Sequence, residues 1–312
     1  MPGFLTHYIG GQSVLESVNP KISGYIAPIA KLYNLGTQGP DIFFYYLPDF
    51  ITSRIRGIGT QMHNGDLGLY FMYMADFLKN SGSPAQRQIV FAYTAGFLAH
   101  YAIDVRTHAY IYGKTHVSAS KIKESAYHRH FETSIDVLML SRIYNRRPMD
   151  YKQWKLISPA KIHLMVAAAA MSEAVRNVYN RNINPIDIYQ AMGQMALFTK
   201  YLQSKNGWRK RRLGRIEDIT VGSRIISALI HMQEVTDGYD YLNIQKSPWC
   251  APWAPEEIRM ESFIELFESA VSDAGDMVKA LYAYMHNDLP KDELVKIIMN
   301  RSLKTGLDKN YE

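Results

Sequence analysis

Apolar residues recur every three to four positions along most of this chain. One such segment covers residues 66–79, and a second runs from Pro84 to His108 after a Ser-Gly-Ser-Pro break. This recurrence is typical of helices with one buried face. It also predicts helices over six later ranges: 118–144, 158–181, 185–204, 219–236, 256–287 and 291–303.

Several predicted helix starts place proline or acidic residues in the opening turn, as Ser158-Pro159 and Asn184-Pro185 do. Alternating strand patterns joined by hairpin turns are not evident in the sequence. We therefore predict an all-α fold, with residues 1–312 forming a single multi-helix domain. The helices of 150–305 are expected to complete the core.

The first 65 residues have a less regular pattern, with glycine and proline between short apolar pieces such as 35–41 and 46–49. We expect loops here, held by the helical scaffold and carrying site residues. The aromatic run Phe43-Phe44-Tyr45-Tyr46 would either line a pocket or belong to the core.

The amino-acid composition limits the possible chemistry of the site more than it limits the possible folds. The chain has 312 residues, of which 47% are hydrophobic, enough for a large core. Its single cysteine, Cys250, excludes an internal disulfide and argues against thiolate zinc sites. The formal charge of +6 fits anionic substrates but is common in soluble proteins. The run Trp208-Arg-Lys-Arg-Arg212 with Arg215 suits phosphates or lipid head groups, although such runs are usually solvated surface.

Two features bear on location. The N-terminal residues lack the basic and apolar regions of a signal peptide, and the longest apolar run, 164–171, is too short to cross a membrane. We expect a cytoplasmic protein without a transmembrane helix.

The strongest chemical signal is the spacing of histidine and carboxylate residues. His100, Asp104 and His108 are four residues apart, as are His128 and Glu132, so each set lies near one face of a predicted helix. Imidazole and carboxylate suit a zinc-type ion, and a central aspartate can bridge two ions. Seven of the ten histidines precede residue 131. This crowding favours a multinuclear metal hydrolase over hydrogen-bonded structural histidines.

The order of these residues resembles that of the bacterial zinc-dependent phospholipases C. It consists of His7, Gly39-Pro40-Asp41, His63, the segment Gly96–His108, and His128-x-x-x-Glu132-x-x-x-Asp136. The resemblance covers residues 1 to about 140 and extends, more distantly, to the fungal single-strand-specific zinc nucleases. It implies an all-helical fold and two to three zinc ions, with the metal site within residues 1–140.

The resemblance also implies a role for each residue. Asp41, His63, His100 and one oxygen of Asp104 would hold the first zinc, and His108, His128 and Glu132 the second. The other oxygen of Asp104, His7 and the free amine of Pro2, left by removal of Met1, would hold the third. Asp104 and Asp41 would be the catalytic residues, since Asp104 joins the two ions that activate water and Asp41 orients that water. Apart from the resemblance, His116 and His130 are the spare polar groups expected near the site, and either would contact a metal ligand rather than the metal.

The implied activity is hydrolysis of a phosphate ester, nominally a phospholipase C diester. The substrate would be a phospholipid or a nucleotide, with peripheral membrane contact as one expected interaction and no obligate protein partner evident. A nuclease or nucleotidase of the same fold is the first alternative. The second is a non-catalytic helical protein stabilised by metal.

Overall fold

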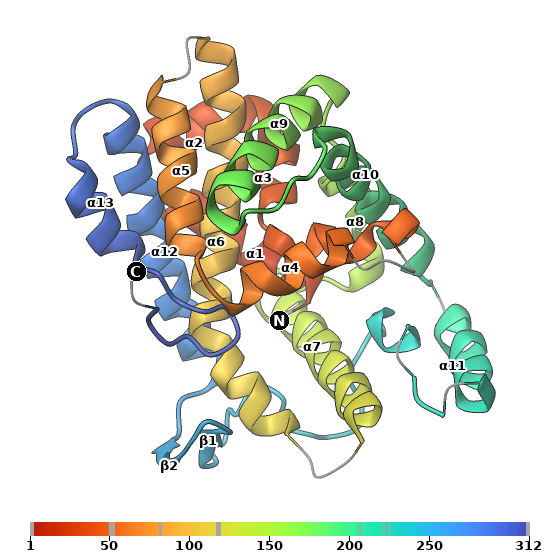
Figure 1. Ribbon diagram of the computed structural model, residues 1–312. Helices are drawn as coiled ribbons and strands as arrows, with labels where there is room; N and C mark the ends of the chain where they lie inside the picture. Colours follow the sequence, from red (N-terminus) through yellow and green to blue (C-terminus); the bar gives the residue numbers. More distant parts are fainter. Residues whose placement is uncertain are drawn as a thin grey trace.

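The computed structural model describes residues 3–49, 54–80, 83–116, 120–205, 207–220, 222–224 and 226–309. These parts of the chain are mostly helical, which confirms the predicted fold class (Figure 1). The α-helices are α1 (Phe4–Ser17), α2 (Pro20–Ile26), α3 (Ala30–Gly36), α4 (Arg54–Asn64), α5 (Leu67–Asn80), α6 (Pro84–Thr115), α7 (Lys121–Tyr144), α8 (Gln153–Leu156), α9 (Lys161–Tyr179), α10 (Pro185–Leu202), α11 (Trp208–Thr220), α12 (Phe263–Met285) and α13 (Lys291–Ile298). The short 3₁₀ helices are η1 (Ala27–Ile29), η2 (Gly39–Tyr45), η3 (Leu47–Asp49), η4 (Pro148–Asp150) and η5 (Ser227–Leu229).

Helix α6 is the axis of the fold and is buried on all sides over most of its length. Its side chains from Ile89 to Val105 are almost completely enclosed. Helices α1, α3, α5, α7, α9 and α12 pack around it, as Figure 1 shows for the 32-residue helix near the centre of the view. A helix that is apolar on every face is stable only where neighbouring helices cover all of its surface. The consequence is that polar residues in the middle of α6 are cut off from water.

Helices α3 and α6 cross at close range. A Cβ atom added to Gly96 would stand 2.2 Å from the carbonyl oxygen of Tyr33, and one added to Gly36 would stand 2.3 Å from that of Tyr93. Two facing glycines therefore let the backbones touch at this point. The contact places η2, which follows α3, beside the part of α6 that carries His100.

Several helix starts follow the sequence signals. Asn184 accepts a hydrogen bond from the backbone N–H of Ile186 at 2.9 Å, ahead of Pro185. Ser262 and Glu265 form a reciprocal capping box at the start of α12. This cap explains why the helix predicted from residue 256 begins only at Phe263.

Four sequence expectations are wrong. The first 65 residues are largely helical where described, because α1, α2, α3 and α4 bury their apolar residues in the core. Residues 219–236 are not one helix, because Gly222 adopts a left-handed φ of +70° and the chain turns back. A small antiparallel hairpin, β1 (Trp249–Ala251) and β2 (Ala254–Arg259), interrupts the all-α pattern. The basic run 208–212, which falls between the predicted helices 185–204 and 219–236, lies within α11.

The described helices include none that is both long and apolar enough to cross a membrane.

Candidate metal centre

The three α6 residues of the motif lie at the buried centre of the molecule. His100 and Asp104 are fully enclosed and His108 is 2% exposed. Their spacing of four residues points them along one side of the helix. Ionisable side chains at such depth need partners of opposite charge or a metal ion.

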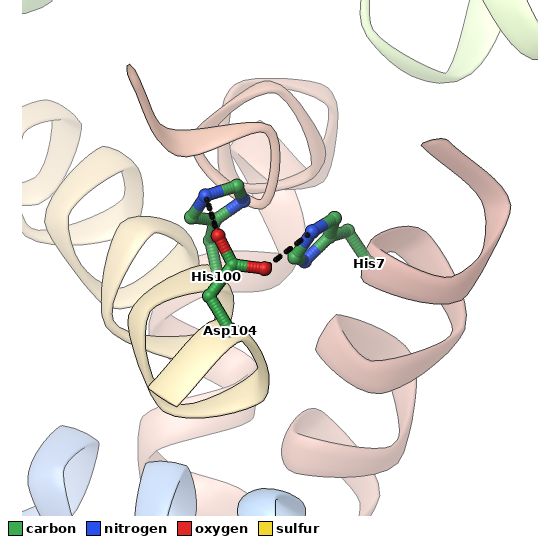
Figure 2. A group of neighbouring side chains, drawn as sticks. All are labelled: His7, His100 and Asp104. Atoms are coloured by element: carbon green, nitrogen blue, oxygen red, sulfur yellow. Dashed lines mark ion pairs between the residues drawn. The ribbon is translucent and has the colours of Figure 1, made fainter. Parts of the chain in front are cut away.

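Asp104 faces two histidines from different helices. Its Oδ1 lies 3.3 Å from His7 Nε2 of α1, and its Oδ2 lies 3.1 Å from His100 Nε2 of the same helix, as Figure 2 shows. The two rings are stacked with centroids 4.0 Å apart. The carboxylate therefore presents one oxygen to each imidazole, the arrangement expected of a bridging ligand.

These close contacts are not hydrogen bonds. Among the described residues, both oxygens of Asp104 and the Nε2 atoms of His7 and His100 are buried without a hydrogen-bond partner. A buried polar atom in this state is costly unless an ion or water satisfies it. The donor set of two imidazoles and a carboxylate fits zinc in type, and its ligand atoms lie within 4.8 Å of one another.

A second group joins His100 to residues of the N-terminal part. Asp41, in the first turn of η2, places Oδ1 3.2 Å from Nε2 of His63 at the end of α4. The ligand atoms of Asp41, His63 and His100 also lie within 4.8 Å of one another. Gly39 makes this approach feasible, because its φ is +50° and a Cβ there would stand 2.4 Å from His100 Cδ2.

The third group consists of His108 from α6 with His128 and Glu132 from α7. Their ligand atoms meet the same 4.8 Å limit, and His128 Nε2 lies 2.6 Å from Glu132 Oε1. His108 Nε2 is buried without a hydrogen-bond partner among the described residues. His108 thus groups with residues of α7 rather than with His100 and Asp104, because it lies about one helical turn beyond Asp104 and two beyond His100.

Four of the histidines are oriented through their other ring nitrogen. Nδ1 of His63 lies 2.6 Å from the carbonyl oxygen of Gly59, and Nδ1 of His100 lies 3.1 Å from that of Thr37. His108 Nδ1 is close to the carbonyl of Leu303, and His128 Nδ1 lies 3.0 Å from Thr115 Oγ1. A backbone carbonyl can only accept, so the first three rings carry their proton on Nδ1. Their Nε2 lone pairs are then directed into the site, as metal ligation requires.

The charge states suit ligation as well. Burial lowers the pKa of His7 and lowers the pKa of His108 to about 3, so both rings are neutral. Burial alone would raise the pKa of Asp104, but His100, His108 and His7 outweigh it and hold that pKa well below its usual range. Burial is likewise outweighed at Glu132, where neighbouring groups including His128 bring the pKa to about 2. Asp104 and Glu132 are therefore ionised where His7 and His108 are neutral.

The structure brings together eight of the nine predicted ligands, and Pro2 lies outside the described residues. The predicted supporting histidines lie elsewhere. His116 Nδ1 is 2.9 Å from Glu124 Oε1 on the surface, whereas His130 Nε2 is 3.4 Å from the hydroxyl oxygen of Tyr241.

Asp136, which ends the His128-x-x-x-Glu132-x-x-x-Asp136 series, received no predicted role. Its fully buried carboxylate accepts hydrogen bonds from the N–H groups of Leu5 and Thr6 at 2.9 and 2.8 Å and from Thr6 Oγ1 at 2.6 Å. His231 Nε2 lies 2.6 Å from the same carboxylate. Asp136 therefore fastens the first turn of α1 to α7 and positions His7. Its place four residues after Glu132 was the available signal, whereas nothing in the sequence marked His231.

A cleft opens beside the third group. Its walls include Phe4, Tyr45, Glu132, Asp136, Gln203 and His231. The aromatic run divides between the two predicted roles: Tyr45 lines the cleft, whereas Phe43 is in the core and Tyr46 is buried, donating to Asp187 Oδ1 at 2.7 Å. Phe44 lies 5.4 Å from the His63 ring. The site therefore has an apolar and neutral-polar wall next to its metal-binding groups.

Comparison with known families agrees with this geometry. The model of the family described as "Zinc dependent phospholipase C" matches residues 6–180, more than half of the chain. Comparisons with curated proteins and with solved structures give no match. The matched region begins just before His7 and contains all eight described candidate ligands. The chain therefore belongs to the zinc-dependent phospholipase C family.

Proposed function

We propose that the protein is a phosphoric ester hydrolase that uses two to three zinc ions and acts on a phospholipase C-type diester. Family membership and the candidate metal-binding groups support a metal-dependent hydrolase. The observation that carries the proposal is the Asp104 carboxylate, fully buried and with each oxygen 3.1–3.3 Å from a different histidine. Such a carboxylate suits two ions held side by side.

Each group has a proposed assignment. Asp41, His63, His100 and Asp104 would hold one zinc, His7 and Asp104 another, and His108, His128 and Glu132 the third. Zinc supplies Lewis acidity and lowers the pKa of a coordinated water. The protein contributes imidazoles oriented by backbone carbonyls, and the Asp104 and Glu132 carboxylates, which stay ionised at neutral pH.

Asp41 is the proposed proton acceptor. It lies at the edge of the site, with 15% of its side chain exposed, whereas Asp104 is sealed. Partial access to water lets a carboxylate orient an attacking water and exchange a proton with solvent. The third group borders the cleft through Glu132, which suits it to the leaving-group side of the ester.

Two other functions use the same features. A nuclease or nucleotidase would need the same metals, because the walls of the cleft rather than the metals select the substrate. A non-catalytic protein would hold zinc in closed coordination. The partly exposed Asp41–His63 edge and the adjoining cleft favour a site that substrates reach.

The substrate class can be tested with zinc-loaded protein and a panel of esters. We expect turnover of short-chain phosphatidylcholine above that of single-stranded oligonucleotides and of nucleoside monophosphates, measured as released phosphocholine, nucleotides or phosphate. Faster cleavage of oligonucleotides would instead assign the nuclease function. Turnover of none of the three would contradict the phosphoric ester proposal.

A further inference from the structure

Helix α11 carries arginines and large apolar residues on the same outward side. At 100° per residue, Trp208, Arg211, Arg212, Arg215, Ile216 and Ile219 fall within a continuous arc of less than half the helix circumference. All six are exposed, and Ile219 is 87% exposed. Isolated apolar side chains on a surface need no explanation, but three on one helical arc with three cations do.

The acidic residues of α11 are turned away from this arc. Glu217 is buried and accepts hydrogen bonds from the N–H groups of Ile226 and Ser227 at 2.5 and 3.0 Å. Asp218, at the flank, forms an ion pair with Arg224 at 2.8 Å. The outward face therefore keeps its positive charge, and its apolar side chains are not covered by the protein.

Hydrogen bonds hold α11 beside the cleft. Arg209 Nη1 donates to the carbonyl oxygens of Tyr201 and Gln203 at 2.7 and 2.9 Å, and Lys210 Nζ donates to that of Ile230 at 2.7 Å. Gln203 and residues on either side of Ile230 line the cleft. In Figure 1, α11 stands apart at the periphery, below α10. Anything bound by α11 thus lies close to one wall of the cleft.

The surface around α11 also carries exposed apolar and basic side chains. Tyr201 is 63% exposed and Ile226 is 50% exposed. Ser223 Oγ donates to the carbonyl oxygen of Ile122 at 3.5 Å, so the first turn of α7 lies close by. Ile122 is exposed between two exposed lysines. By contrast, the exposed Ile258 of β2 follows Glu256 and Glu257, both exposed.

We propose that the outward face of α11 docks on the surface of an anionic lipid bilayer. Arginines bind lipid phosphates, and tryptophan prefers the membrane interface. An isoleucine side chain is stabilised where it is buried at the boundary between the head groups and the acyl chains. A polynucleotide would satisfy the arginines but would leave Ile216 and Ile219 exposed. The inference rests on the proposed function in one respect, that docking brings the cleft to a lipid substrate. Binding itself needs no hydrolysis.

Co-sedimentation with phosphatidylcholine vesicles, with and without phosphatidylserine, tests the proposal. We expect the wild type to bind the anionic vesicles, and binding to weaken as salt is added. Replacing Arg211, Arg212 and Arg215 by Gln should weaken binding about a hundredfold, since each basic residue near an anionic surface contributes about fivefold. Ile219→Ser should weaken it by about tenfold.

Two control variants match these changes elsewhere on the surface. Gln at Arg142, Arg146 and Arg181 removes the same charge, and Ile258→Ser removes another well-exposed isoleucine, 73% exposed against 87% for Ile219. Both variants should bind as the wild type does. Failure of the wild type to bind anionic vesicles would overturn the proposal, and so would equal losses in test and control variants. Stronger binding to a single-stranded oligonucleotide than to vesicles would do the same.

A water-soluble short-chain phosphodiester separates this proposal from the function. None of the α11 residues changed here lines the cleft, so all variants should hydrolyse that substrate at the wild-type rate. Vesicle binding without hydrolysis would contradict the proposed function and leave the docking face supported. Hydrolysis without vesicle binding would support the proposed function and contradict the docking face.

Discussion

Asp104→Asn should lower hydrolysis at saturating zinc by at least about a hundredfold, as expected when a metal-activated water is lost. The substitution keeps the shape of the side chain, so packing inside α6 should survive. It removes the negative charge that now faces His7 and His100, and it turns one of the two oxygens into an amide nitrogen that cannot bind a metal. The carboxylate could then no longer join two ions.

The measurement is the initial rate on a soluble phosphodiester, together with bound zinc per chain. Asp276→Asn on α12 is a matched control, because this aspartate is 65% exposed and forms its ion pair with Lys279, three residues away on the same helix. It should leave both quantities unchanged. Near-normal turnover of Asp104→Asn would mean that Asp104 is structural.

The largest effect on stability is expected from Gly96→Val at the crossing of α3 and α6. The new Cβ would fall 2.2 Å from the carbonyl oxygen of Tyr33, a backbone atom that cannot move without shifting α3. We expect the free energy of unfolding to fall by about 3–5 kcal/mol, above the range usual for overpacked cores, because the clash is with backbone. The shift would also move η2, and with it Asp41, away from His100.

Urea denaturation followed by circular dichroism measures this effect. The control is Gly193→Ala on the exposed face of α10, where an added Cβ meets nothing within 4 Å. It should raise the free energy of unfolding by about 0.5–1 kcal/mol, because alanine loses less backbone entropy in a helix. An unchanged midpoint for Gly96→Val would show that the two helices are not in close contact.

The sequence predicted the long helices well because their apolar period is regular and their starts are marked. Helices α5, α7, α9 and α10 end within a few residues of their predicted limits. The secondary-structure predictions fail where contacts between distant parts of the chain determine the local conformation. The turn after α11 depends on Glu217 accepting from the backbone at Ile226, a partner nine residues away that periodicity does not encode.

The candidate site was more predictable than the fold around it. A spacing of four residues on a helix fixes which side chains share a face, so His100 with Asp104 and His128 with Glu132 followed directly. Spacing did not show which helix would complete each group. The ligand roles of His7 and Asp41 came from the family resemblance. His231 was missed because it approaches Asp136 from a segment with no motif.

The most direct test of the account is a zinc titration of chelator-stripped protein, with hydrolysis of short-chain phosphatidylcholine followed at each step. The account predicts background turnover without metal, a rise with added zinc, and a plateau at two to three bound ions per chain. Two to three tightly bound ions with turnover still at background would contradict it, and would identify a metal-stabilised helical protein instead.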